Sequence, residues 1–214
     1  MSEAKQFFRV RFSKQGDVRF ISHHDLMRLF ERALRRARLP VAMSQGFNPR
    51  PLFSLPAPLG VGLEGLNEVL DFELAQWVRP DEVRERLARQ LPEGIRIESL
   101  QNTPSRLERC PKQLCYRVEL REGHPVSEAR IKALLAAERF LVHRCRDGKS
   151  KTVDIRPFVA QIRLAGGALL FLLNATQEGT ARPEEVLEAL GCTPGLHYLR
   201  SSLQRTHVNL SSSL

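Results

Sequence analysis

Cysteine is scarce in this chain, and long apolar runs are missing from it. The 214 residues include only four cysteines, too few for a disulfide scaffold in a chain of this size. No apolar run approaches the roughly 20 residues that a membrane helix needs, and residues 1–6 lack the pattern of a secretory signal. We therefore expect a cytoplasmic protein with free thiols and no membrane contact.

Negative charge is also in short supply, most of all in the first part of the chain. The formal net charge is +9, and residues 1–60 hold 11 Lys or Arg against 4 Asp or Glu. Clustered cations gain affinity for polyanions by releasing condensed counterions from phosphates. This distribution favours a polyanionic partner such as RNA, and the alternative is a charge that serves solubility alone.

The hydrophobic pattern predicts two similar halves, because strand-like alternation and helix-like spacing follow each other in the same order twice. Strands are expected at 7–12, 18–21, 41–44, 68–74, 94–100, 114–120, 140–146, 151–155, 159–164, 168–173 and 198–203. Helices are expected at 25–38, 80–91, 126–138 and 182–190. This order indicates an α+β protein of two tandem ferredoxin-like (β-α-β-β-α-β) subdomains with antiparallel sheets. The expected domains are 1–103 and 113–210, with a connection at 104–112 and a tail at 211–214.

The first predicted helix is the strongest candidate for a contact surface. Ser22 is its expected N-cap, and Asp25 falls in its first turn, where a negative charge suits the helix dipole. Its apolar positions recur every three or four residues, at Leu26, Phe30, Ala33, Leu34 and Ala37. The other faces carry Arg28, Arg32, Arg35, Arg36 and Arg38. These guanidiniums suit phosphate oxygens; the alternatives are a solvated face or ion pairs with the acidic residues of 64–73.

The segment 46–51, with the sequence Gly-Phe-Asn-Pro-Arg-Pro, predicts an ordered turn. Phe47 offers a ring for stacking, while Asn48 and Arg50 offer donors for a base and a phosphate. In the structural alternative, Phe47 fills the core and the Asn-Pro step only fixes the turn. The residue types alone leave both interpretations open.

Three residues are candidates for catalysis, namely His23, Asp25 and Asp154. An imidazole titrates near neutral pH and can serve as acid or base. However, adjacent residues of a helix do not face each other, so His23, His24 and Asp25 cannot form a dyad in helical geometry. For these histidines we favour a contact to phosphate or base. For Asp154 we favour a local salt bridge with Arg156 over an active-site role.

Longer motifs in the chain resemble a known family. They are residues 19–40 (RFISHHDLMRLFERALRRARLP), 44–51 (SQGFNPRP), 58–74 (PLGVGLEGLNEVLDFEL) and, more loosely, 153–159 (VDIRPFV). In these motifs the chain resembles the radical-SAM-linked proteins of unknown function, whose domain occurs alone or fused behind a B12-binding radical SAM enzyme. The resemblance covers nearly the whole chain. It implies a radical SAM partner and a modification related to nucleic acids.

The chain lacks the cysteines to carry radical SAM chemistry itself. Such an enzyme holds its iron–sulfur cluster with three closely spaced cysteines, commonly Cys-x3-Cys-x2-Cys. Here only Cys110 and Cys115 lie near each other, and a zinc site that adds His124 or His143 lacks the short Cys-x2-Cys spacing. We therefore expect no metal and no cofactor in this chain.

Together these features favour an RNA-binding accessory module that presents tRNA or rRNA to a separate radical SAM modification enzyme. The residues expected to contact nucleic acid are Arg19, His23, His24, Arg28, Arg32, Arg35, Arg36, Phe47, Asn48, Arg50 and Arg156. One alternative is a stand-alone RNA-modifying or RNA-cleaving enzyme that resembles tRNA pseudouridine synthases in architecture, although their Arg-Thr-Asp tripeptide is missing here. The other is a protein-interaction module for a radical SAM partner without RNA contact.

Overall fold

The computed structural model describes residues 5–103, 110–146 and 148–210. The chain divides into two compact units, one of Met1–Cys110 with Leu210–Leu214 and one of Pro111–Asn209. Of the expected connection 104–112, only residues 110–112 are described, and the expected tail 211–214 lies outside the described residues.

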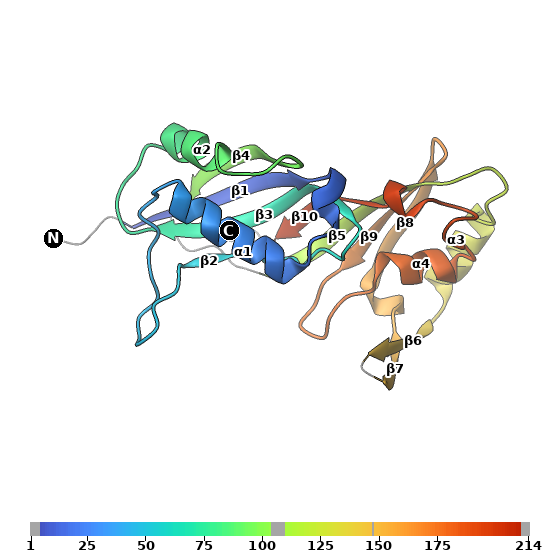
Figure 1. Ribbon diagram of the computed structural model, residues 1–214. Coiled ribbons are helices and arrows are strands. Elements are labelled where there is room, and N and C mark those ends of the chain that lie inside the picture. Colours follow the sequence, from blue (N-terminus) through green and yellow to red (C-terminus); the bar gives the residue numbers. More distant parts are fainter. Residues whose placement is uncertain (1–4, 104–109, 147, 211–214) are drawn as a thin grey trace. The chain divides into compact units, whose positions relative to one another are not determined.

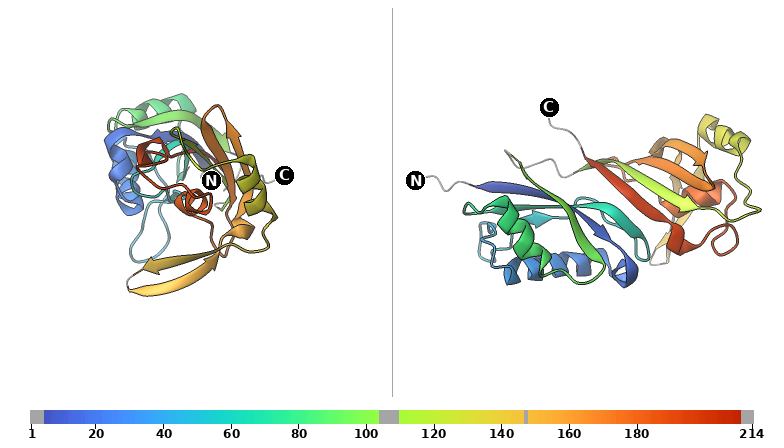
Figure 2. Two further views of the ribbon diagram at one scale, coloured as in Figure 1. Left: turned by 90° about the vertical axis from the view of Figure 1, so that its right-hand side faces the viewer. Right: turned by 90° about the horizontal axis from the view of Figure 1, so that it is seen from above.

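The first unit packs two helices against a sheet (Figure 1). Its elements are β1 (Gln6–Lys14), the 3-10 helix η1 (Gly16–Phe20), α1 (His23–Arg36), β2 (Phe53–Ser54), β3 (Glu64–Leu74), α2 (Pro80–Ala88) and β4 (Ile95–Thr103). Strand β1 lies between β3 and β4 and is antiparallel to both, and β2 pairs with β3. Both helices bury their apolar positions in one cluster with β1, so they cover the same face of the sheet (Figure 2).

Helix α1 forms as its sequence predicts. The Ser22 hydroxyl accepts the backbone N–H of Asp25 at 3.1 Å, which confirms the predicted N-cap. Leu26, Phe30, Ala33 and Leu34 are buried, and the Phe30 ring meets that of Phe12 edge-on at 4.8 Å. The arginines therefore remain on the outward faces of α1.

A buried lysine positions the chain that enters α1. Lys14, at the end of β1, is 1% exposed, and its ammonium donates to the carbonyl oxygens of Arg19 at 3.1 Å and Ile21 at 3.2 Å. Nearby, the backbone N–H of Gln15 donates to the carbonyl of Gly94 at 2.8 Å. Gly94 has a φ of +88°, and a Cβ there would lie 2.4 Å from the Gln15 carbonyl oxygen. The start of α1 and the turn before β4 are thus both fixed to the end of β1.

The second unit contains β5 (Pro111–Glu119), α3 (Glu128–Ala136), β6 (Leu141–Arg146), β7 (Lys149–Asp154), the 3-10 helix η2 (Arg156–Phe158), β8 (Val159–Ala165), β9 (Ala168–Asn174), α4 (Pro183–Ala189), the 3-10 helix η3 (Arg200–Ser202) and β10 (Gln204–Leu210), whose last residue belongs to the first unit. Strand β9 is antiparallel to both β5 and β8. The rings of Tyr116 and Phe171 stack at 5.4 Å across β5 and β9.

Strands β6 and β7 form a separate ribbon, and an ion pair connects it to α4. The Arg144 guanidinium donates to both carboxylate oxygens of Glu185, at 2.7 and 2.8 Å, and also to the Thr180 carbonyl at 2.9 Å. The bond to Glu185 raises the pKa of Arg144. Glu185 also accepts the backbone N–H of Arg182 at 2.8 Å, so the same carboxylate caps α4.

The prediction of two tandem ferredoxin-like subdomains is wrong, although the protein is α+β. In the described part of the chain, the second unit does not repeat the first. Its sheet has the order β10-β5-β9-β8, and β6 and β7 form a separate two-stranded sheet, whereas the first unit has the order β4-β1-β3 with β2 beside β3. Alternation in a sequence shows which residues face the core, but not which strand edges pair. An edge strand presents unpaired N–H and C=O groups that another strand can satisfy, and no side-chain pattern records that choice.

Three of the predicted strands are also wrong. Residues 18–21 lie largely in η1, because the Ile21 N–H turns back to the Val18 carbonyl at 3.2 Å. In 41–44, Val41 and Met43 make only isolated bridges. The segment 198–203 precedes the closing strand, which is β10.

Candidate nucleic-acid interface

A hollow of about 690 Å³ lies between one side of α1 and the end of α2 with the chain that follows it. Its lining residues on α1 are Asp25, Arg28, Leu29, Arg32 and Arg36. The remaining lining residues are Ile21, Arg89, Gln90, Leu91 and Pro92. Positions three or four apart share one face of a helix, so the α1 residues form a continuous stripe along the hollow.

The three arginines of the stripe differ in the contacts that their side chains make within the protein. Arg28 is 70% exposed at its side chain and lies 3.5 Å from a carboxylate oxygen of Asp25. Arg32 is exposed and has no ion pair or side-chain hydrogen bond within the described ranges. Arg36 donates to the carbonyl oxygen of Gln90 at 2.7 Å. The stripe therefore presents two accessible guanidiniums and one that is fixed against the opposite wall.

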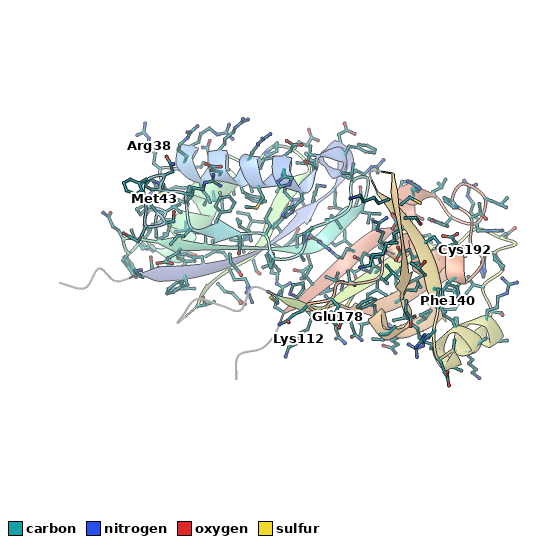
Figure 3. The ribbon with its side chains drawn as sticks, turned by 90° about the horizontal axis from the view of Figure 1, so that it is seen from below. Arg38, Met43, Lys112, Phe140, Glu178 and Cys192 are labelled. Atoms are coloured by element: carbon teal, nitrogen blue, oxygen red, sulfur yellow. The ribbon has the colours of Figure 1, made fainter. Side chains whose placement is uncertain are left out.

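Arg35 and Arg38 lie on α1 or just after it, outside the hollow. Both are exposed, and Figure 3 labels Arg38 near the end of the helix, with Met43 further along the chain. The predicted contact residues on this helix thus separate into a group that lines the hollow and a group that faces solvent elsewhere.

The acidic residues of 64–73 do not neutralise the helix. Asp71 pairs with Arg9 of β1 at 2.7 Å, and Glu64 pairs with Arg19 of η1 at 3.6 Å. Ion pairing between this stretch and the α1 arginines was one alternative from the sequence, and these contacts contradict it. Arg19 itself, a predicted contact residue, also lies over the Phe20 ring at 4.7 Å.

The first turn of α1 brings together His23, His24 and Asp25. The two imidazole rings are 6.1 Å apart and tilted by 59°. The Asp25 carboxylate accepts the Ser22 hydroxyl at 2.7 Å, and this bond, assisted by the charges of Arg28 and His24, lowers the pKa of Asp25. A carboxylate with a lowered pKa is a weak proton acceptor near neutral pH. Asp25 therefore suits the role of a counter-charge better than that of a general base.

The loop 44–51 projects as a narrow excursion between α1 and β2 (Figure 1). It is closed at its base, where the Ser44 N–H donates to the Arg50 carbonyl at 2.8 Å and the Arg50 N–H donates to the Ser44 hydroxyl at 2.9 Å. Phe47 is 106% exposed, which contradicts the alternative that it fills the core. Asn48 and Arg50 are exposed as well. None of these three residues lines the hollow.

Asp154 and Arg156 lie in the second unit and make backbone contacts. Asp154 accepts the N–H of Phe140 at 2.9 Å and that of Arg156 at 3.0 Å, and these bonds, the one from Phe140 most, lower its pKa. The Arg156 guanidinium donates to the carbonyls of Leu135 and Val159, at 3.1 and 2.9 Å. Both side chains therefore organise the end of the β6–β7 ribbon, and their predicted salt bridge is not formed.

The zinc alternative receives no geometric support. Cys110 is exposed, and Cys115 is half-buried in β5, where burial raises the pKa of its thiol. Over the described residues, no three His, Cys, Asp or Glu side chains gather as metal ligands.

Sequence reasoning missed the second wall of the hollow, formed by Arg89 to Pro92. These residues follow α2 and meet α1 only through the tertiary fold. The Leu-Pro step at 91–92, where the predicted helix 80–91 ends, is the one local signal that could have drawn attention to them.

The fold and the hollow define a basic α+β protein with an arginine-lined surface site. The chain belongs to the family described as "Uncharacterized protein conserved in bacteria (DUF2344)", whose model matches residues 8–183. No curated protein matches the chain. Among solved structures, an unknown protein from Galdieria sulphuraria is similar, with 17% identity over 87% of this chain and 90% of that chain and a TM-score of 0.31. None of the helices in the described ranges combines the length and the apolar composition that a membrane span requires.

Proposed function

We propose that this protein binds RNA in the hollow beside α1 and presents it to a separate radical SAM enzyme that modifies it. The observation that carries the proposal is the stripe of Arg28, Arg32 and Arg36 along one wall of the hollow. Guanidiniums bind phosphate oxygens through charge-assisted and often bidentate hydrogen bonds.

The geometry of the stripe suits a run of phosphates. Its arginines are four residues apart, so their Cα atoms follow each other at about 6 Å along the helix axis. This spacing is comparable with the separation of successive phosphates along an extended strand. Arg28 and Arg32 are exposed and reach outward, so a strand laid along the hollow can meet both.

The exposed loop 44–51 supplies a second part of the proposed contact surface. Phe47 extends fully into solvent on a loop whose base is held by two hydrogen bonds. An exposed aromatic ring on an ordered support is suited to stack on an unpaired base. In the proposed role, the loop holds a part of the RNA that the hollow does not reach.

An accessory role fits the candidate catalytic residues better than an enzymatic one. The lowered pKa values of Asp25 and Asp154 leave both carboxylates ionised near neutral pH, and Asp154 is occupied by two backbone N–H groups. The sequence also lacks the cysteine triplet of a radical SAM enzyme. The resemblance to radical-SAM-linked proteins supports a partner that supplies the chemistry.

The test is crosslinking of the full-length protein in the cells that make it, followed by sequencing of bound RNA and identification of bound proteins. Three forms are compared: wild type, the double variant Arg28→Ala/Arg32→Ala, and Arg35→Ala. Arg35 is the matched control, because it is an exposed arginine of the same helix that does not line the hollow. We expect wild type and Arg35→Ala to recover RNA together with a radical SAM enzyme, and the double variant to lose the RNA.

Equal RNA recovery by the double variant would contradict the assignment of the hollow. Recovery of the enzyme without RNA would instead identify a protein-interaction module. Turnover of RNA by the purified protein alone would identify an enzyme, and both of these results would overturn the proposal.

A further inference from the structure

The hollow combines charged and apolar lining residues. The apolar ones are Ile21, which precedes α1, Leu29 of α1 itself, and Leu91 and Pro92 on the opposite side, where Arg89 and Gln90 complete the lining. Together the four apolar residues form the apolar wall. The first three of them pack on the border of the core of the first unit, so their accessible parts form a fixed apolar surface. A phosphate group by itself needs only hydrogen-bond donors and positive charge, not an apolar surface. The apolar wall therefore points to a ligand that has a flat, apolar part next to its phosphate.

Arg36 of the stripe contacts the opposite side of the hollow. Its hydrogen bond to the Gln90 carbonyl, at 2.7 Å, joins α1 to the chain after α2 and restrains the plane of the guanidinium. A planar guanidinium in a restrained orientation is a stacking surface for a nucleic-acid base as well as a charge. Arg28 and Arg32 lie along the stripe towards its other end and remain accessible to a phosphate.

Resting on the function proposed above, we infer that the hollow binds an unpaired nucleotide of single-stranded RNA. Its two neighbouring phosphates are bound by Arg28 and Arg32, one by each, and its base lies between the Arg36 guanidinium and the apolar wall. The volume of about 690 Å³ lies within the range of sites that enclose small molecules. A duplex can reach the arginines with its phosphates, but its stacked bases cannot enter the hollow.

The inference is tested with the full-length protein and fluorescently labelled RNA. A short single strand is compared with a hairpin of the same composition whose bases are paired, at one salt concentration. We expect the single strand to bind about tenfold more tightly, which is the effect of one stacked base. Adenosine 5′-monophosphate should displace the strand at about tenfold lower concentration than ribose 5-phosphate, which lacks the base.

Two variants separate base stacking from charge. Arg36→Lys keeps the charge but removes the planar group, so it should weaken the single strand about fivefold and leave the hairpin unchanged. Because this change also disturbs the contact with Gln90, Leu91→Ser is measured as well, and thermal unfolding confirms that both variants are folded. Leu91→Ser should likewise weaken only the single strand.

Equal affinity for strand and hairpin, or equal competition by the two small phosphates, would overturn the inference. If Arg32→Ala then lowers the affinity for the strand and for the hairpin equally, the arginines do bind RNA and only the assignment of an unpaired nucleotide to the hollow is wrong. If neither RNA binds, the proposed function itself fails.

Discussion

The salt dependence of RNA binding gives the sharpest quantitative prediction. Four arginines line the hollow; Arg89 pairs with Glu85 and Arg36 is placed beside the base, so Arg28 and Arg32 are the two expected to neutralise one phosphate each. For single strands, the logarithm of the affinity falls with the logarithm of the salt concentration by about 0.7 per neutralised phosphate. Two contacts give a slope of about −1.4, so the affinity falls about sevenfold between roughly 50 and 200 mM salt. Replacing Arg32 by Ala leaves one contact, a slope of about −0.7 and a fall of about 2.6-fold.

The assay is fluorescence anisotropy of a labelled single-stranded RNA over a series of salt concentrations, with Arg35→Ala as the control. Arg35 shares the helix, the charge and the exposure of Arg32 but does not line the hollow, so its slope should equal that of wild type. Equal slopes for the two variants, whether both reduced or both unchanged, would refute the reasoning. In that case a diffuse basic surface, rather than the stripe, would account for any binding.

Three further predictions concern the counter-charge of the stripe and the fold that supports it. Asp25→Asn removes the carboxylate 3.5 Å from its paired arginine and should raise RNA affinity about twofold in the same assay. Glu185→Ala should lower the free energy of unfolding, measured in urea, by about 2 kcal/mol. The loss is smaller than for a fully buried ion pair because the Arg144 side chain is 23% exposed. The control Glu188→Ala should change this free energy by less than about 0.5 kcal/mol. Gly94→Ala should lower the free energy of unfolding by at least about 2 kcal/mol, because the added Cβ overlaps with neighbouring atoms. Gly123→Ala should lower it by about 1 kcal/mol, because a Cβ there meets open space and only the φ of +76° is unfavourable.

Each of these comparisons has a result that would count against it. An RNA affinity of Asp25→Asn that is unchanged or lower would show that this carboxylate does not weaken binding by the stripe. Equal unfolding midpoints for the two glutamate variants would show that the ribbon does not depend on the ion pair. Equal costs for the two glycine variants would show that the turn before β4 adjusts without strain.

The sequence predicted the helices well because their signals are local. Ser22 and the apolar spacing from Leu26 to Leu34 are enough to locate α1, and the structure starts it at His23. The arginine faces followed from the same spacing. The order of strands within each unit could not be predicted, because backbone hydrogen bonds between strand edges leave no mark on side-chain order.

The limits of sequence reasoning are clearest at the site. The pattern placed Arg32 and Arg35 in one group, since both are arginines on the exposed part of a helix. Only the position of residues 89–92 distinguishes them, because that segment forms a wall beside one and not the other. Phe47 is a second example. A phenylalanine fits a core position as well as an exposed loop, so only the structure shows that this one is exposed.

The contrast between Arg36 and Arg32 has a consequence for how long a ligand remains bound. The hydrogen bond to Gln90 has already ordered Arg36, whereas Arg32 must lose its rotamer freedom when it meets a phosphate. Immobilising such a side chain costs about 0.5–1.5 kcal/mol, which lowers affinity and shortens residence time. A site with one preset and two mobile arginines can hold a strand in register and still release it quickly. Rapid release is what a protein needs if it passes its ligand to another.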